Sequence, residues 1–148
     1  MIHNATSYDI APLEWLVGKY LPAFKGELTV KTDDALLDKF STDEVKIDAF
    51  LDRNKYAPLY TLYLCTDLDN VEKILCHEFC HLKQMEECRL VVNMKDKTFA
   101  FEGKAYSAAY PYKLRPWEVE AFALEDKYRK EWKHRPDRFF HYLKFTPL

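Results

Sequence analysis

The stretch CHEFCHLKQ, from Cys76 to Gln84, carries two histidines four residues apart, with a glutamate directly after the first. Residues four apart on a helix lie one above the other, so His77 and His81 can bind one metal ion together. Glu78 lies about 100° further round the helix, where it can stand beside a metal without binding it. This HExxH pattern is typical of zinc hydrolases in which the glutamate is the general base for a zinc-activated water.

A catalytic zinc site needs a third protein ligand and one open position. Residues 115–125, RPWEVEAFALE, open a second predicted helix that offers Glu118, Glu120 and Glu125. Glu118 and Glu125 share a helix face, whereas Glu120 points about 200° away from Glu118. Ala121, one turn after Glu118, is small enough to let two helices approach closely. Spacing alone leaves the third ligand open between Glu118 and Glu120.

Two other interpretations fit the same stretch. Cys76 and Cys80 also lie four residues apart, and with the histidines they could form a structural zinc site. Structural sites usually place cysteines as CxxC on a turn, so we expect these two thiols to pack as small apolar groups against a sheet. The simplest alternative is a helix whose histidines bind no metal and a second helix whose glutamates form a solvated face.

The composition narrows the class of protein. With 148 residues, 48% hydrophobic and 16% aromatic, the chain predicts one globular domain over 1–148. A net charge of −2 and a pI of about 6.2 argue against nucleic acid as a partner. No apolar run approaches the ~20 residues of a membrane span, and the N-terminus does not resemble a secretory signal. Four cysteines without a disulfide pattern favour a reducing compartment, the cytoplasm.

The predicted elements follow the order helix, strands, helix, hairpin, helix. Helical periodicity and capping residues predict helices at 11–21, 33–40, 71–89 and 117–133, and a last short helix at 137–145. Alternating or apolar β-prone runs predict strands at 26–32, 44–51 and 59–66, and a hairpin over 90–103 that turns at 95–97. Residues 105–116 are expected to be an irregular connection.

The order HEFCHLKQ, FEGKAY, PWEVEA resembles the gluzincin metallopeptidases, and within them small metallopeptidase-like proteins of phages and prophages, over roughly residues 59–133. The resemblance implies an α+β class: a single-domain, minimal zincin-like fold. In it a small antiparallel sheet packs on the HExxH helix and on a second ligand-bearing helix. It further implies a Zn²⁺ cofactor bound by His77, His81 and Glu118, with Glu78 as general base.

The resemblance also implies supporting features. Many gluzincins carry an Asp four residues after the third ligand, and Phe122 stands there, so its orienting role is weakened or moves to Glu125. The strand before the HExxH helix forms an edge along which a substrate backbone can pair. Residues 44–51 are the candidate edge, with 59–66 inside it. Gln84 belongs to the motif, with no firm physical role beyond a hydrogen bond to backbone near the site.

A peptidase also needs a donor for the oxyanion that develops in the transition state. The candidate donors are Tyr106, Tyr110, Tyr112, His134 and His141. We expect this catalytic role to fall to Tyr106 or Tyr110, with Tyr106 preferred. Arg115 lies in the same region and is expected to pair with a glutamate of its own helix.

These features predict a zinc metallopeptidase, an enzyme that hydrolyses peptide bonds of a peptide or protein substrate. It would act in the cytoplasm, of a host cell if the chain is phage-encoded. The alternative is a catalytically weak or inactive metallopeptidase scaffold that binds and inhibits a host protein. Zinc content, and the effect of Glu78→Gln on hydrolysis and on binding, distinguish the two.

Overall fold

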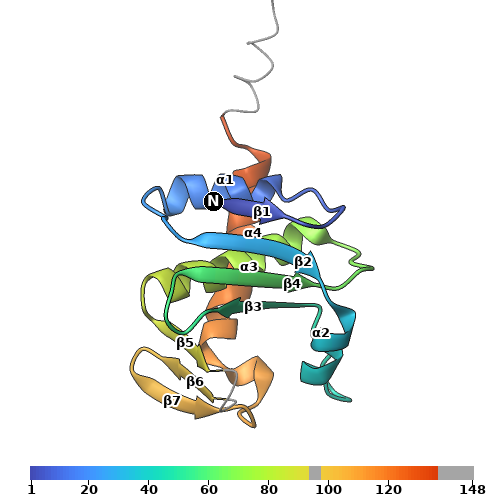
Figure 1. Cartoon of the computed structure of the whole chain (residues 1–148), viewed down its shortest axis with the longest axis vertical. Helices are drawn as coiled ribbons and strands as arrows, with labels where there is room; N and C mark the ends of the chain where they lie inside the picture. Colours follow the sequence, from blue (N-terminus) through green and yellow to red (C-terminus); the bar gives the residue numbers. More distant parts are fainter. Residues whose placement is uncertain (94–97, 137–148) are drawn as a thin grey trace, which may run out of the picture.

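The computed structural model describes residues 1–93 and 98–136. Within these residues the chain forms a four-stranded sheet, a three-stranded sheet and four α-helices around one hydrophobic core (Figure 1). The predicted single-domain α+β class is confirmed. The hairpin tip predicted at 95–97, the last helix predicted at 137–145 and the candidate His141 lie outside the described residues.

The larger sheet is mixed, which corrects the prediction of an antiparallel sheet against the HExxH helix. Its strands are β1 (Ile2–Asn4), β2 (Glu27–Thr32), β3 (Ala49–Arg53) and β4 (Leu59–Leu64), in the order β1-β2-β4-β3. β1 and β4 both run parallel to β2, and only β3 runs antiparallel to its neighbour. The reason is that long connections, with a helix between β1 and β2 and a helix plus β3 between β2 and β4, return the chain in the same direction.

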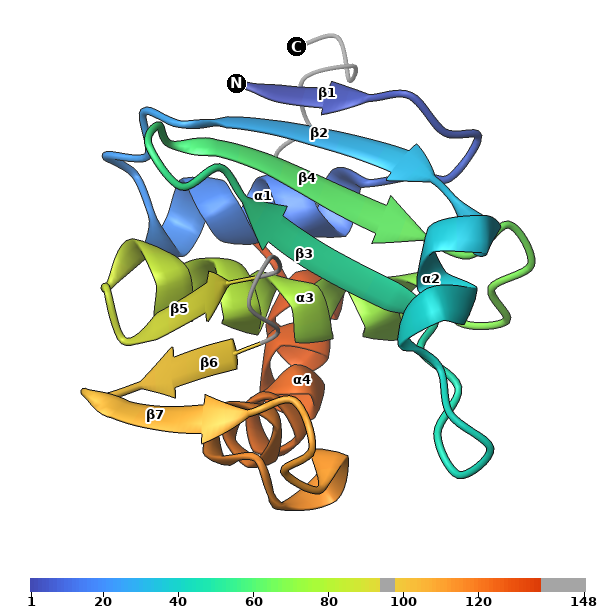
Figure 2. The same cartoon turned by 60° about the horizontal axis from the view of Figure 1, so that its bottom comes forward.

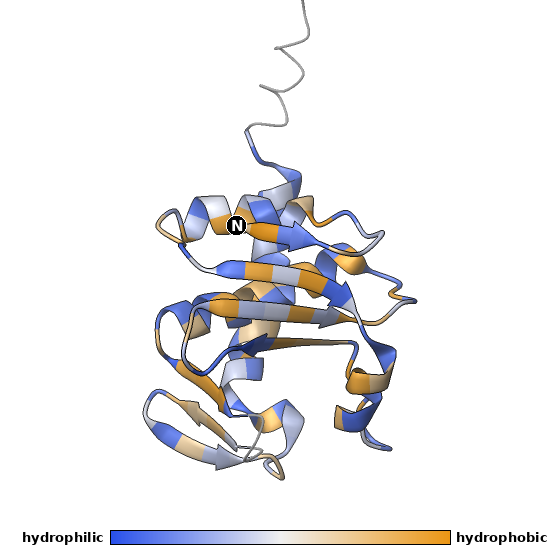
Figure 3. Cartoon of the chain, viewed as in Figure 1, coloured by the Kyte–Doolittle hydropathy of each residue, from blue (hydrophilic) through white to orange (hydrophobic). Residues whose placement is uncertain are grey.

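One face of this sheet forms the core. In β2 the buried side chains are Leu28 and Val30, and in β4 they are Tyr60, Leu62 and Leu64. Figure 3 shows the alternation of apolar and polar residues along both strands. Because successive side chains point to opposite faces, this alternation presents one apolar face to the helices beneath.

The helices stack below that face in two layers. Figure 2 shows α1 (Ala11–Tyr20) and α3 (Val71–Glu86) under the sheet, with α4 (Pro116–Lys133) packed on the far side of α3. The Asn70 side chain caps α3 by accepting a hydrogen bond from the backbone N–H of Lys73 at 3.1 Å, and proline opens α4. None of the described helices combines the length and apolar character needed to cross a membrane. Because α3 lies under the sheet and α4 packs on its far side, helix α3 lies between the sheet and α4.

The smaller sheet is antiparallel and flanks the start of α4. It contains β5 (Leu90–Asn93), β6 (Thr98–Phe101) and β7 (Lys104–Ser107), so the predicted hairpin pairing is confirmed for β5 and β6. β7 replaces part of the irregular connection expected at 105–116. The turn before it uses Glu102 (φ 51°) and Gly103 (φ 83°), and two positive φ angles match the two-residue hairpin turn favoured by strand twist.

β3 lies at the edge of the larger sheet beside β4, where the prediction placed it, but it begins later than residue 44. Residues 42–45 instead form a turn in which the Thr42 N–H donates to the Val45 carbonyl at 2.8 Å. A short helix, α2 (Asp34–Phe40), lies near one end of β3, and the smaller sheet lies below the other end of β3 in Figure 1. These elements surround the face of α3 that carries the HExxH residues.

Candidate metal centre

Helices α3 and α4 meet at a buried cluster of two histidines and one glutamate. Nε2 of His77 and Nε2 of His81 each lie 2.9 Å from Oε1 of Glu118. All three residues are only 7% exposed. The helical period of α3 puts both imidazoles on one face, and Glu118 reaches them from the first turn of α4. The structure thus brings together the three residues predicted as metal ligands.

The other nitrogen of each imidazole faces an acceptor. Nδ1 of His77 lies 3.0 Å from Oε2 of Glu125, and Nδ1 of His81 lies 2.9 Å from Oε1 of Gln84. The orientation of the Gln84 amide is defined, because its Nε2 donates at 3.1 Å both to the Trp117 carbonyl and to a carboxylate oxygen. Both Nδ1 atoms therefore carry protons, and Gln84 gains the physical role that its sequence position did not reveal.

This proton arrangement has a consequence for Glu118. With Nδ1 protonated, a neutral imidazole presents its lone pair at Nε2, so two lone pairs and a carboxylate converge on one point. The two lone pairs and the carboxylate repel one another unless positive charge lies between them. That charge can be protons on the two Nε2 atoms or one metal ion. Two imidazoles and a carboxylate are also the donor set of many catalytic zinc sites, so the residues present fit zinc.

The titration behaviour of the cluster has the same cause. Burial lowers the pKa of His81, but Glu118 outweighs burial and raises it to about 10. The pKa of His77 is raised in the same direction, against burial, by its hydrogen bond to Glu118. Burial likewise opposes ionisation of Glu118, yet the two imidazoles hold its pKa well below the usual range. The cluster is therefore strongly selective for a cation at its centre.

Glu120 does not point into this cluster. Its carboxylate accepts hydrogen bonds from Gln84 and Arg89, on the side of α4 away from the imidazole Nε2 atoms. The ambiguity between Glu118 and Glu120 is resolved by geometry, since only Glu118 contacts both histidines. Phe122, at the position where many gluzincins have an Asp, packs its ring 4.6 Å from that of His77. Glu125 makes the orienting contact instead, one turn further along α4.

Glu78 lies beside the cluster and is also 7% exposed. Its Oε2 is buried and has no hydrogen-bond partner among the described residues. Burial raises the pKa of this carboxyl above its usual range, although His81 and His77 oppose the shift. Glu78 also offers a ligand atom within 4.8 Å of those of the two histidines. It is therefore placed to bind a metal or, as predicted, to exchange a proton beside one.

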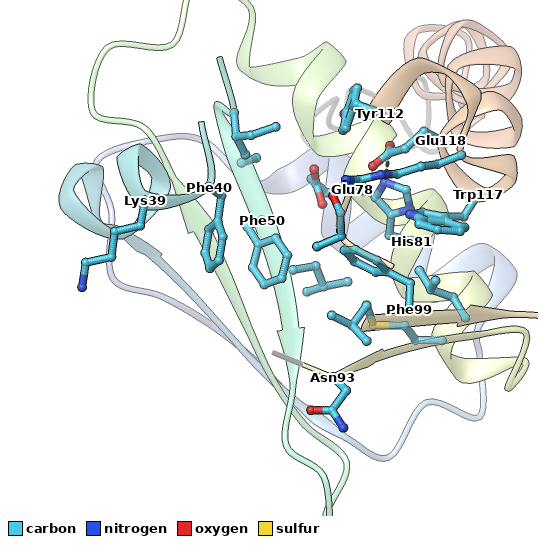
Figure 4. Close-up of a pocket in the computed structure, with 18 residues that line it drawn as sticks. Lys39, Phe40, Phe50, Glu78, His81, Asn93, Phe99, Tyr112, Trp117 and Glu118 are labelled. Atoms are coloured by element: carbon cyan, nitrogen blue, oxygen red, sulfur yellow. Dashed lines mark hydrogen bonds and ion pairs between the residues drawn. The ribbon is translucent and has the colours of Figure 1, made fainter. Parts of the chain in front are cut away.

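A cavity of about 370 Å³ opens in front of Glu78 (Figure 4). Glu78, His81 and Glu118 lie at one end of it, and most of the remaining wall is apolar. The apolar side chains come from α2, β3, α3 and the smaller sheet, and they include Phe40, Phe50, Met85, Leu90, Val92 and Phe99. The arrangement combines a polar reaction centre with an apolar binding space, as ligand sites in proteins commonly do.

Of the tyrosines among the described residues, Tyr112 lines the cavity and Tyr106 does not. Tyr106 lies on β7, with its ring centroid 5.2 Å from that of Trp117 and 5.0 Å from that of Tyr110. Tyr112 lies beside Glu118 in Figure 4. Burial, with the carboxylates of Glu118 and Glu78, raises the pKa of Tyr112, so its hydroxyl keeps its proton and can donate a hydrogen bond.

Two further residues considered in the sequence lie elsewhere or act differently. Arg115 lines the cavity, but it donates to the carbonyls of Tyr110 at 3.1 Å and Ala108 at 3.0 Å instead of pairing with a glutamate of its own helix. His134 is exposed and caps the C-terminal end of α4, the opposite end from Glu118. It therefore does not contribute to this site.

Cys80 of the opening stretch faces α4 rather than the sheet, which corrects the position expected for it. Sγ of Cys80 lies 3.4 Å from the Cys76 carbonyl and 3.9 Å from the Ala121 carbonyl of α4. Ala121 is small and fully buried, which lets the two helices approach at this point. Spacing alone could not reveal this, because it does not say which side of α3 the second helix will cover.

Comparison with known proteins adds no family to this description: no family model, no curated protein and no solved structure matches the chain. The chemical interpretation of the site therefore rests on its geometry alone. That geometry could have been anticipated for His77, His81, Glu78 and Glu118. A signal for Gln84 also existed, since it lies three residues after His81 on the same helix.

Proposed function

We propose that the protein is a zinc-dependent metallopeptidase of the gluzincin type. The observation that carries this proposal is the convergence of two imidazole nitrogens and the Glu118 carboxylate beside a buried carboxylate, Glu78, that has a free oxygen. His77, His81 and Glu118 would hold the metal. When bound, zinc would supply Lewis-acid chemistry that activates water near neutral pH.

Glu78 is the proposed general base. Its pKa is raised by burial towards the pH at which a carboxylate both accepts and returns a proton efficiently. Tyr112, rather than the predicted Tyr106, is proposed to donate to the oxyanion, because it lines the same cavity and keeps its proton. Glu78 lies on α3, and Tyr112 lies on the short helix η1 (Tyr112–Leu114), which packs against α4. Because α3 and α4 pack together, the relative positions of the two groups are held before a substrate binds.

The substrate we propose is a peptide with an apolar side chain next to the bond that is cut. β3 is an edge strand whose outer backbone groups are available to pair with an extended chain. Ala49, Phe50 and Leu51 of that strand also line the cavity. A peptide lying along β3 would therefore bring its backbone past Glu78 while one side chain enters the apolar space.

We also propose that the protein acts in the cytoplasm. Cys65, Cys76, Cys80 and Cys88 are all free thiols, and three of them are buried. Free thiols of this kind are typical of proteins kept in a reducing compartment. A thiol titration of protein purified without reductant tests this, and recovery of a disulfide in the active protein would count against it.

The decisive experiment is Glu78→Gln in zinc-loaded protein. We expect unchanged zinc content with hydrolysis of a casein or peptide-library substrate reduced by about 100- to 10,000-fold, because general-base catalysis is lost. Tyr112→Phe should lower kcat by about 100-fold with little change in KM, and Tyr106→Phe is its matched control. Full hydrolysis by the Glu78 variant would remove the base assignment.

The alternative is a binding protein that uses a metallopeptidase scaffold against a host protein. Two features of the sequence favour this alternative: Phe122 stands where many gluzincins have an Asp, and no single residue is evident as the oxyanion donor. Glu125 now contacts His77, and Tyr112 lines the cavity, so neither argument favours it over catalysis. Partner capture that is unchanged by chelator and by Glu78→Gln, with no hydrolysis by the zinc-loaded wild type, would favour it instead.

A further inference from the structure

A chain of hydrogen bonds leads from His81 outward to the turn between β6 and β7. Gln84, which accepts from His81, donates to Oε1 of Glu120 at 3.1 Å. The Glu120 carboxylate in turn accepts from both terminal nitrogens of Arg89, at 2.8 and 2.6 Å. Arg89 also donates to Glu102 in that turn, at 3.1 and 2.6 Å. The chain thus links α3, α4 and the smaller sheet to one candidate metal ligand.

The end of α3 explains why Arg89 is in position for this. Cys88 has a φ of 59°, and the N–H groups of Cys88 and Arg89 donate to the carbonyls of Met85 at 3.0 Å and Gln84 at 2.9 Å. This pattern is a Schellman motif, in which one left-handed residue turns the chain back over the last helical turn. Arg89 is therefore tied to Gln84 through its backbone as well as through Glu120.

The orientation of the Gln84 amide matters for the metal. If the amide were rotated by half a turn, its nitrogen would face Nδ1 of His81, and that imidazole would carry its proton on Nε2. A protonated Nε2 cannot bind a metal ion. The present orientation is enforced by two acceptors, the Trp117 carbonyl and Glu120. Glu120 can serve as an acceptor there because Arg89 holds its carboxylate through two parallel bonds.

We infer that Arg89 and Glu120 are positioning residues for the metal centre, acting through Gln84 to keep a proton on Nδ1 of His81, so that Nε2 is the nitrogen that binds the metal. The inference rests on the proposed function only in so far as His81 binds zinc. It concerns metal binding rather than catalysis, and neither residue contacts the proposed ligand atoms. The ion pair that joins Arg89, just after the end of α3, to Glu120 of α4 thereby gains a role beyond bracing the two segments.

The test measures zinc affinity by competition with a chromogenic chelator in the full-length protein. Outer partners of metal ligands typically contribute 10- to 100-fold to affinity, so Gln84→Met should weaken zinc binding by about 10- to 100-fold. Arg89→Met should weaken it by about 10-fold, and Arg89→Lys should recover part of the loss. The control is Lys83→Met, which removes one positive charge and a 2.7 Å ion pair from the same helix, with zinc affinity within about two-fold of wild type.

A double variant separates positioning from bracing. If Arg89 acts through Gln84, Arg89→Met combined with Gln84→Met should bind zinc no more weakly than Gln84→Met alone. The visible spectrum of the cobalt-substituted protein should change in the same variants, which a loss of stability alone does not cause. Thermal unfolding in excess chelator reports the bracing contribution separately. If Arg89→Met unfolds, Arg89→Lys and Glu120→Gln carry the same test.

Wild-type zinc affinity in Arg89→Met, or independent and additive losses in the double variant, would overturn the inference. Failure of the proposed function looks different. A wild type that binds zinc tightly but cleaves no peptide removes the peptidase proposal and leaves the positioning role intact. A wild type that binds no divalent metal removes both. Normal cleavage with an Arg89 variant that keeps full zinc affinity removes the positioning role alone.

Discussion

Two pairs of residues with the same spacing lie side by side on α3, and they have different chemistry. His77 and His81 are four apart, and so are Cys76 and Cys80. All four side chains are buried, and those of both histidines and of Cys80 contact α4. The difference comes from what α4 presents to each pair. Glu118 and Glu125 contact the histidines, whereas the carbonyl of a small residue, Ala121, faces Cys80.

Burial favours the neutral form of both pairs, but only the cysteines remain neutral. Burial raises the pKa of Cys76 to about 12 and also raises that of Cys80, so both thiols stay protonated and neutral. Burial alone would also keep the histidines neutral, but Glu118 reverses the effect and favours a cation. The i, i+4 spacing on α3 therefore offers two candidate metal pairs, and the partner helix selects one of them.

The largest effect on zinc affinity is expected from removing Glu118, the residue of α4 that distinguishes the two pairs. Glu118→Ala should weaken zinc binding by about 100- to 1000-fold, because one of three protein ligands is lost and two imidazoles remain. The measurement is competition with a chelator, with metal content determined by elemental analysis. If the variant keeps wild-type affinity, Glu78 rather than Glu118 completes the ligand set, since it also lies close to both histidines.

The next test uses pH. Because the pKa of His81 is raised to about 10, a proton must leave its Nε2 when zinc binds, and apparent zinc affinity should rise by about ten-fold per pH unit between pH 6 and 8. The metal-free fold behaves oppositely. A folded pKa above the unfolded value of 6.5 means that this stabilisation is fully present below pH 6.5 and is lost as pH rises to about 10.

Urea titrations in chelator at several pH values measure that loss directly. The control is His81→Gln, which should flatten the dependence between pH 6.5 and 9. The thiols contribute only above pH 9, since the folded pKa of Cys76 lies above its ordinary value of 9.0. A metal-free protein whose stability is unchanged from pH 6.5 to 9 would show that Glu118 does not hold a proton on His81.

A smaller effect is expected from the cysteine side of the interface. Cys80→Ala should lower the free energy of unfolding by about 1 kcal/mol, because a buried sulfur is lost and the small gap is only partly refilled. Zinc affinity should remain within about two-fold of wild type. A loss of zinc affinity beyond ten-fold in Cys80→Ala would mean that the thiol takes part in the metal site after all.

The smallest effect concerns the exposed thiol at the end of the same helix. Cys88 adopts a φ of 59°, which glycine tolerates without strain, so Cys88→Gly should stabilise the protein by about 0.5 kcal/mol. In the native wild type a thiol reagent should modify Cys88 rapidly and Cys76 and Cys80 slowly, and the rapid phase should vanish in this variant. Rapid labelling that persists would mean that the helix interface opens.

Some of these features could be predicted because they depend on one element at a time. The period of 71–89 predicted a helix with both imidazoles on one face, and α3 (Val71–Glu86) has that arrangement. Proline before Trp117 predicted the start of α4. The short β1 was missed, because three residues carry too little periodicity, and β7 was missed although Glu102-Gly103 is a recognisable turn signal.

Other features depend on how elements meet. Tyr112 rather than Tyr106 lines the cavity because η1 (Tyr112–Leu114) packs against the start of α4, while Tyr106 makes an edge-to-face contact with Trp117. The parallel pairing of β2 with β4 follows from long connections whose path the sequence does not specify. Neither choice leaves a local signal, because both are decided by packing between segments far apart in the chain.

Helical periodicity is a local property of the backbone, so the sequence alone predicts a helix that presents His77, Glu78 and His81 at metal-binding spacing. The contacts that bring Glu118 into the cluster and orient the imidazoles through Gln84 and Glu125 exist only in the folded chain, which also leaves the cysteines outside the cluster. The reason is that the proton and charge state of a buried side chain depends on the groups facing it across an interface, and that interface forms only when α4 packs on α3.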